Sequence, residues 1–267
     1  GAEPQYPKEG GDGRKMELTF RKGVRDGLPI CLGYVSVSFA FGMMAVEGGL
    51  PAWVGLLISM TNLTSAGQFA GLELILSGGL YLEVAVTTFV INVRYLLMSL
   101  SLSQKVDPAM SRLERFLLSF GITDEIFAVA VQQKEPVNSR YLTGLISMPY
   151  VGWALGTLLG ATAAGILPAP VRSALGIAIY GMFLAIIIPP AVKAKPAAGS
   201  RLCRSALAGG GRGRGSKGGG LMKNLPYVLT CIFFMAAVTY LVRMLPLTIF
   251  RKGSHNRFIR SFLSCLF

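Results

Sequence analysis

Acidic side chains are scarce in this chain, and none follows Glu135. The 267 residues include 13 Asp or Glu against 26 Lys or Arg, and charged residues make up only 15% of the sequence. A soluble domain usually carries charge on about a quarter of its residues, so much of this chain is not expected to face water. The acid-free half also holds a basic cluster between Lys193 and Lys223. Such clusters typically mark the cytoplasmic side of a membrane protein and favour contact with anionic lipid.

Motifs for catalysis and metal binding are missing as well. The cysteines share no short spacing, and the single histidine, His255, lies in a basic terminal segment. There is no Walker loop, HExxH or GxSxG motif. The run GGGRGRGSKGGG at 209–220 has no GK[ST] ending and no aromatic residue on which a base could stack. We therefore expect no enzyme activity, no metal or cofactor, and no nucleic-acid partner.

Long apolar runs are what the sequence has instead, and 52% of its residues are hydrophobic. A membrane helix needs roughly 20 consecutive apolar residues. Uncharged stretches of about that length or more occur at 27–46, 48–72, 141–171, 173–192 and 224–242. They lack the polar face that a core helix of a soluble protein would turn to water. The sequence therefore predicts an all-α, polytopic protein of the bacterial cytoplasmic membrane.

Candidate membrane segments cover 28–46, 53–76, 81–102, 116–131, 141–167, 171–188 and 225–250. If all of them cross, the basic residues between 105 and 115 fall outside, against the usual bias. If segments 53–76 and 116–131 each enter and leave the membrane on the same side, all basic clusters are cytoplasmic. The one basic residue on the other side is then Arg172. Polar interruptions at Met60–Gln68 and Thr123–Glu125 favour such broken segments. Between five and seven membrane segments are therefore expected, some of them broken or re-entrant.

Three glycines repeat at four-residue spacing in segment 141–167. They are Gly152, Gly156 and Gly160, and they share one face of a helix. A face without side chains lets a neighbouring helix approach closely. We predict that this face packs against another membrane helix, and it indicates nothing about substrate.

Arg94 is the clearest charge inside an apolar segment, near the middle of 81–102. A charge in the hydrocarbon region costs roughly 2.5 to 3.5 kcal/mol even on mild insertion scales, so it needs a reason. Two interpretations stay open. Arg94 either forms a salt bridge to Asp124, Glu125 or Glu73 that ties helices together, or it holds a substrate carboxylate through paired hydrogen bonds.

Four further polar residues are candidates for the same site. Asp124 and Glu125 are adjacent, so on a helix they lie about 100° apart and at most one faces Arg94 directly. The other is a candidate proton carrier, or it caps the start of a broken helix. Gln68 and Asn92 offer amide donors and acceptors to an ammonium or a carboxylate. We predict that the two amides and Arg94 bind substrate.

Five short motifs occur in order along the first two thirds of the chain. They are GLPICLGY at 27–34, TSAGQFA at 64–70, INVRYLLMS at 91–99, TDE at 123–125 and IAIYGMF at 177–183. Together they resemble the AzlC family, the large subunit of bacterial branched-chain amino acid exporters. One departure is Tyr95, at a place where relatives often show histidine, and this makes Asp124 or Glu125 the better candidate for proton coupling.

A second resemblance begins at Met222. The motifs MKNLPY at 222–227, TYLVRMLPLT at 239–248 and NRFIRSF at 256–262 are similar to the start of the AzlD family, the small partner subunit. Four regions are therefore expected: a basic cytoplasmic segment at 1–26, an AzlC-like transport domain at 27–192, a Gly/Arg-rich linker at 193–221, and a partial AzlD-like segment with one transmembrane helix at 222–267.

The resemblance implies export of valine, leucine, isoleucine and methionine, coupled to an ion gradient. It also implies an AzlD-like subunit, fused in part or separate. An apolar cavity with an arginine, two carboxylates and amides suits a zwitterion with an aliphatic side chain. The sequence leaves alternatives open: a channel or uptake carrier for another small zwitterion, or a transport-incompetent scaffold or truncated subunit that needs a separate partner.

Overall fold

Helices make up the regular structure of the described part of the chain, and four of them are long and apolar enough to cross a membrane. The computed structural model describes residues 18–166 and 224–249. The four long helices are α1 (Phe20–Glu47), α4 (Tyr81–Lys105), α7 (Ser139–Ala163) and α10 (Leu225–Ile249). The prediction of an all-α, polytopic membrane protein is thereby confirmed. The predicted segment 171–188 and the linker 193–221 lie outside the described residues.

Two of the expected segments are broken in the middle. The first consists of α2 (Ala52–Asn62) and α3 (Ser65–Ser77), and the second of α5 (Arg112–Ser119) and α6 (Asp124–Val131). Leu63 ends α2 with a φ of 44°, a left-handed backbone conformation that residues other than glycine rarely adopt. Thr64 and Thr123 precede the second half of each segment with extended backbone.

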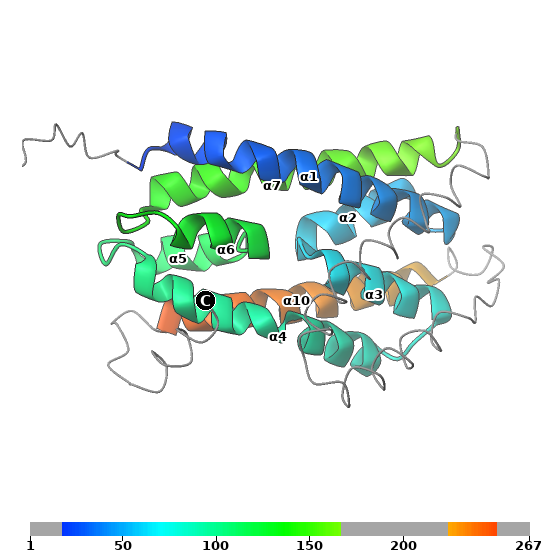
Figure 1. The fold of residues 1–267 in the computed structure, drawn as a ribbon. Coiled ribbons are helices and arrows are strands. Elements are labelled where there is room, and N and C mark those ends of the chain that lie inside the picture. The colour runs from blue at the N-terminus through cyan, green and yellow to red at the C-terminus, as the bar shows by residue number, and fades with distance from the viewer. Residues whose placement is uncertain (1–17, 167–223, 250–267) are drawn as a thin grey trace, which may run out of the picture.

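Each broken segment returns to the side from which it came. The Leu76 side chain near the end of α3 lies against Gly48, which follows the end of α1. Lys22 near the start of α1 donates a hydrogen bond of 2.8 Å to Gln133, just after α6. The pair α2–α3 therefore forms a hairpin from one side and α5–α6 a hairpin from the other, with their tips toward the middle (Figure 1). This is the second of the two topologies considered above.

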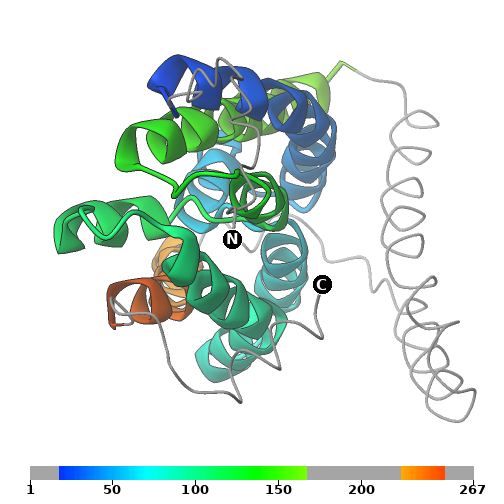
Figure 2. The same ribbon diagram turned by 60° about the vertical axis from the view of Figure 1, so that its left-hand side comes forward.

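The four long helices pack as two parallel pairs. Along α1 and α7, Gly23 lies against Tyr141 and Gly42 lies against Thr157, so both helices run in the same direction. Along α4 and α10, the rings of Tyr81 and Tyr227 are 5.3 Å apart, and further along the pair Asn92 donates to Thr239 at 2.9 Å. Figures 1 and 2 show the α1–α7 pair on one side of the two hairpins and the α4–α10 pair on the other.

These elements form two units of inverted orientation. The first unit is α1, the hairpin α2–α3 and the parallel partner α7. The second unit is α4, the hairpin α5–α6 and the parallel partner α10, and it runs in the opposite direction (Figure 1). Leu63-Thr64 and Ile122-Thr123 occupy corresponding places in the two hairpins. Inverted repeats with broken helices at the midplane are a common architecture of secondary transporters.

Glycines allow the close approach of α1 and α7. Gly152 faces Cys31, Gly156 faces Val35 and Ser38, and Gly160 faces the backbone of Phe39. At all three positions an added Cβ would overlap an atom of α1. The glycine face of α7 is therefore turned to α1, and the main chain of α7 contacts the main chain and small side chains of α1 directly.

We expect Gly156→Ala to destabilise the protein, because the new methyl group would collide with Ser38 and the backbone of Val35. Overpacking of this kind costs about 1–3 kcal/mol. That cost should lower the melting temperature of the detergent-solubilised protein by several degrees. Gly165→Ala is the matched control, since a Cβ at Gly165 meets open space. Equal melting temperatures for the two variants would contradict the packing described here.

Candidate functional site

A cavity of about 290 Å³ lies between the tips of the two hairpins. Ligand pockets are typically about 300–1,000 Å³, so this one suits a small solute. Both apolar and polar side chains line it, and they come from α1, α4, α7 and the two breaks. The lining residues are Pro29, Ile30, Gly33, Tyr34, Val37, Leu63, Thr64, Ser65, Tyr95, Thr123, Asp124, Glu125 and Trp153.

Two threonines stand at the starts of α3 and α6 and line the cavity. Neither hydroxyl caps its own helix. Thr64 instead donates to Asn92 at 3.1 Å and lies 3.4 Å from the Tyr95 hydroxyl, while Thr123 lies 2.6 Å from the Tyr34 hydroxyl. Each tyrosine on a long helix thus contacts a threonine on the hairpin of the other unit. The two units are therefore joined at the cavity by equivalent polar contacts.

The partner of each tyrosine ring differs between the units. In the first unit Trp153 packs edge-on against Tyr34, with ring centroids 4.9 Å apart. In the second unit the guanidinium of Arg243 lies 4.2 Å from the centroid of the Tyr95 ring. An aromatic contact and a cation–π contact occupy corresponding places. The two tyrosines thus have ring partners at corresponding places that differ in charge.

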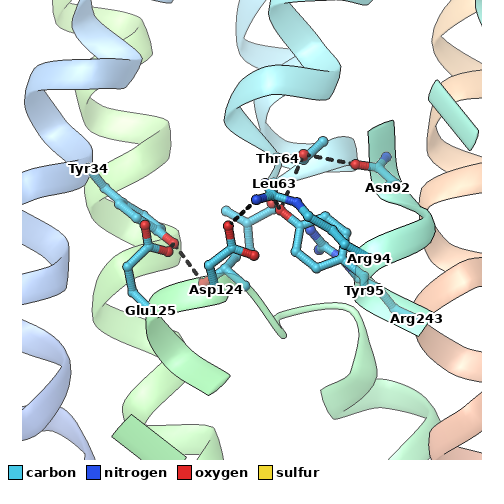
Figure 3. A network of polar contacts seen from close by, with 10 residues as sticks. Tyr34, Leu63, Thr64, Asn92, Arg94, Tyr95, Asp124, Glu125 and Arg243 are labelled. Carbon is cyan, nitrogen blue, oxygen red and sulfur yellow. Dashed lines mark hydrogen bonds and ion pairs between the residues drawn. The ribbon is translucent and has the colours of Figure 1, made fainter. Parts of the chain in front are cut away.

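Both carboxylates at the start of α6 line the cavity, and each has its own partner. Asp124 forms an ion pair of 2.6 Å with Arg94. The Asp124 side chain is 33% exposed and that of Arg94 is 45% exposed. Glu125 accepts a hydrogen bond of 2.5 Å from Tyr34. Because a phenol has one proton, the Thr123 hydroxyl then supplies the proton of its own contact with Tyr34. Figure 3 shows the two carboxylates turned toward different partners.

The three predicted substrate ligands are not among the residues that line the cavity. Each instead bonds to one that is: Gln68 accepts from Trp153 at 3.2 Å, Asn92 accepts from Thr64 at 3.1 Å, and Arg94 pairs with Asp124. Gln68 and Asn92 are fully buried. A buried amide must satisfy its hydrogen bonds within the protein, so these two hold the cavity wall. Direct contact of these two amides with substrate stays a prediction.

Sequence reasoning missed Arg243, which is fully buried in α10. Its guanidinium donates to the carbonyl oxygen of Phe120 at 2.6 Å and to that of Leu63 at 2.9 Å. It lies inside the predicted membrane segment 225–250, although the uncharged stretch 224–242 ends just before it. Because α10 spans Leu225–Ile249, Arg243 is an intramembrane charge of the same kind as Arg94.

Comparisons with known proteins agree with this architecture. Residues 29–167 match the family model described as AzlC protein. An uncharacterized membrane protein of Archaeoglobus fulgidus is 35% identical over 172 residues, which are 64% of this chain and 75% of that protein. The inner membrane protein YgaZ of Escherichia coli is 30% identical over 178 residues, 64% of this chain and 72% of YgaZ.

An uncharacterized membrane protein of Helicobacter pylori is 27% identical over 148 residues, 53% of this chain and 64% of that protein. No solved structure matches the chain. The family model covers α1 from Pro29 onward, the long helices α4 and α7 and both hairpins, and it ends before α10. The chain is thus a multi-pass protein of the cell membrane and belongs to the AzlC family of membrane transporters.

Proposed function

We propose that this chain exports branched-chain amino acids, namely valine, leucine, isoleucine and also methionine, by a mechanism coupled to an ion gradient. The observation that supports the proposal most directly is the cavity, whose lining combines two carboxylates with apolar side chains. The wall includes Ile30, Val37 and Leu63, which suit an aliphatic side chain. The carboxylates of Asp124 and Glu125 suit an ammonium group.

The opposite charge of a zwitterion needs a second contact. The start of α3 at Thr64 and Ser65 lines the same cavity, and this helix has no acidic residue in its first turn. Its free N–H groups and its dipole favour a carboxylate. The start of α6 already carries two carboxylates. A substrate bound between the two hairpin tips would therefore place its ammonium toward α6 and its carboxylate toward α3.

In this proposal, Arg94 supports the site indirectly, because its ion pair with Asp124 holds that carboxylate in place. Its Nη1 is engaged by Asp124, and its Nη2 donates to the Tyr95 hydroxyl at 3.4 Å. A substrate carboxylate would have to compete with Asp124 for this guanidinium. Opening of that ion pair by a proton on Asp124 would link transport to the proton gradient. Glu125, bonded to Tyr34, is the second candidate for the same proton.

The inverted units give the proposal a route for movement. In proteins of this architecture, one unit or hairpin moves relative to the other around a fixed midplane site. The contacts Tyr34–Thr123 and Tyr95–Thr64 join opposite units and would have to exchange in such a movement.

A facilitated carrier with the same cavity is the second candidate function. Abolishing the membrane potential and the pH gradient should stop export against a valine gradient but leave downhill flux by a facilitated carrier intact.

Glu125→Gln should reduce valine export at least tenfold, because the cavity loses a negative charge that offsets the substrate ammonium. Cells loaded with a valine-containing dipeptide release valine, and the rate of its appearance outside is the measurement. Glu135→Gln is the control, since Glu135 is exposed beyond the end of α6 and should export normally. Wild-type export by Glu125→Gln would show that this carboxylate does not bind substrate or couple its transport.

The Arg94–Asp124 ion pair should behave as one unit in a double-mutant cycle. Arg94→Ala and Asp124→Asn should each lower valine export at least tenfold, because each leaves one charge in the membrane without its partner. The double variant should lose no more than the worse single variant. Immunoblots of membrane fractions correct for protein amount. Losses that multiply would indicate separate roles, and equal export by wild type and Arg94→Ala would refute a role for Arg94.

A further inference from the structure

Two half-helices end in the middle of the molecule, and their last carbonyl groups need donors. Leu63 is the C-terminal cap of α2 and Phe120 is that of α5. The final carbonyls of a helix have no donor within the helix, and together they amount to roughly half a negative charge. In a membrane interior, such groups are costly unless the protein itself supplies donors.

Arg243 donates to both of these carbonyl oxygens with different nitrogens. Nη1 bonds Phe120 at 2.6 Å and Nη2 bonds Leu63 at 2.9 Å. One guanidinium charge therefore faces two helix ends of roughly half a negative charge each. The side chain is fully buried, and the Tyr95 ring covers the guanidinium. Figure 3 shows Arg243 and Tyr95 together beside Leu63.

Neighbouring polar groups on α10 make the same connection. Thr239, one turn before Arg243, accepts from Asn92 at 2.9 Å and donates to Asn62 at 3.4 Å. Asn62 is the last residue of α2, next to the break. One face of α10 therefore contacts α4 and the tips of both hairpins, whereas Phe233 on the same helix is exposed.

We propose that Arg243 is a positioning residue that fixes the two hairpin tips relative to each other and thereby sets the shape of the cavity between them. The proposal rests on the proposed function for the claim that this cavity carries substrate. An arginine is required because its planar fork reaches two carbonyls while its face stacks on Tyr95. Lysine supplies the charge but has no planar fork. The helix that resembles the small subunit thus completes the site of the large-subunit-like part.

Hydrogen exchange tests the positioning role without reference to any substrate. In purified, detergent-solubilised protein, Arg243→Lys and Arg243→Ala should raise amide exchange at least tenfold at 62–66 and 120–124. Exchange along α1 and α7 should stay as in wild type. Arg140→Ala is the matched control, because Arg140 is exposed at the start of α7. Unchanged exchange at both breaks, or an increase spread equally over α1 and α7, would overturn the proposal.

Chemical rescue separates positioning from a general loss of folding. Methylguanidinium should restore slow exchange at both breaks of Arg243→Ala, and methylammonium should not, because only the former carries the planar fork. Failure of methylguanidinium to restore any protection would also overturn the proposal. In proteoliposomes the same addition should recover part of the valine transport lost in Arg243→Ala. Rescue of exchange without valine transport by the wild-type protein would refute the proposed substrate and leave the positioning role intact.

Discussion

A bilayer tolerates broken helices only where the protein itself satisfies the exposed backbone groups, and the rest of this structure depends on that constraint. Two helices end close to one another inside the molecule, so two sets of orphan carbonyls and two sets of orphan N–H groups face the interior. The carbonyl ends converge on a single buried guanidinium, that of Arg243. The N–H ends, at Thr64 and Thr123, face the cavity. A cavity lined by free N–H groups follows when two membrane segments are broken and their breaks lie next to each other.

The two inverted units bring two equivalent hairpin tips to one cavity, and the two tips differ in charge. Equivalent tyrosine–threonine contacts hold both hairpins across the unit boundary. The start of α6 carries two carboxylates, while the start of α3 carries none. The two helix starts that line this one small cavity therefore favour opposite charges. A solute that is itself neutral but bipolar fits such a site better than an ion of either sign, because it leaves the net charge of the membrane interior unchanged.

The fold was largely predictable from the sequence, and the cavity wall was not. Apolar runs located the long helices, and polar interruptions located both breaks, because a break needs polar groups that a continuous helix does not. The pattern could not tell which side of each helix faces the cavity. Asn92 and Tyr95 lie on nearly the same face of α4, yet only Tyr95 lines the cavity. The Asn92 amide is instead hydrogen-bonded to Thr64, which lines the cavity in its place. Arg243 lies inside the predicted segment 225–250, but its role could not be predicted, because its acceptors, the carbonyls of Leu63 and Phe120, are far away in the sequence.

Packing of α10 against the remaining helices satisfies polar groups on both partners. An unpaired arginine in a membrane helix costs roughly 2.5 to 3.5 kcal/mol even on mild scales, and α10 recovers this cost only when Arg243 meets the two carbonyls. The hairpins have the complementary need, because their tips expose carbonyls until a donor arrives. The residues matched by the AzlC model end before α10, so among the described residues this donor comes from outside the matched region. The guanidinium of α10 and the carbonyl ends of the two hairpins thus satisfy one another within a single chain.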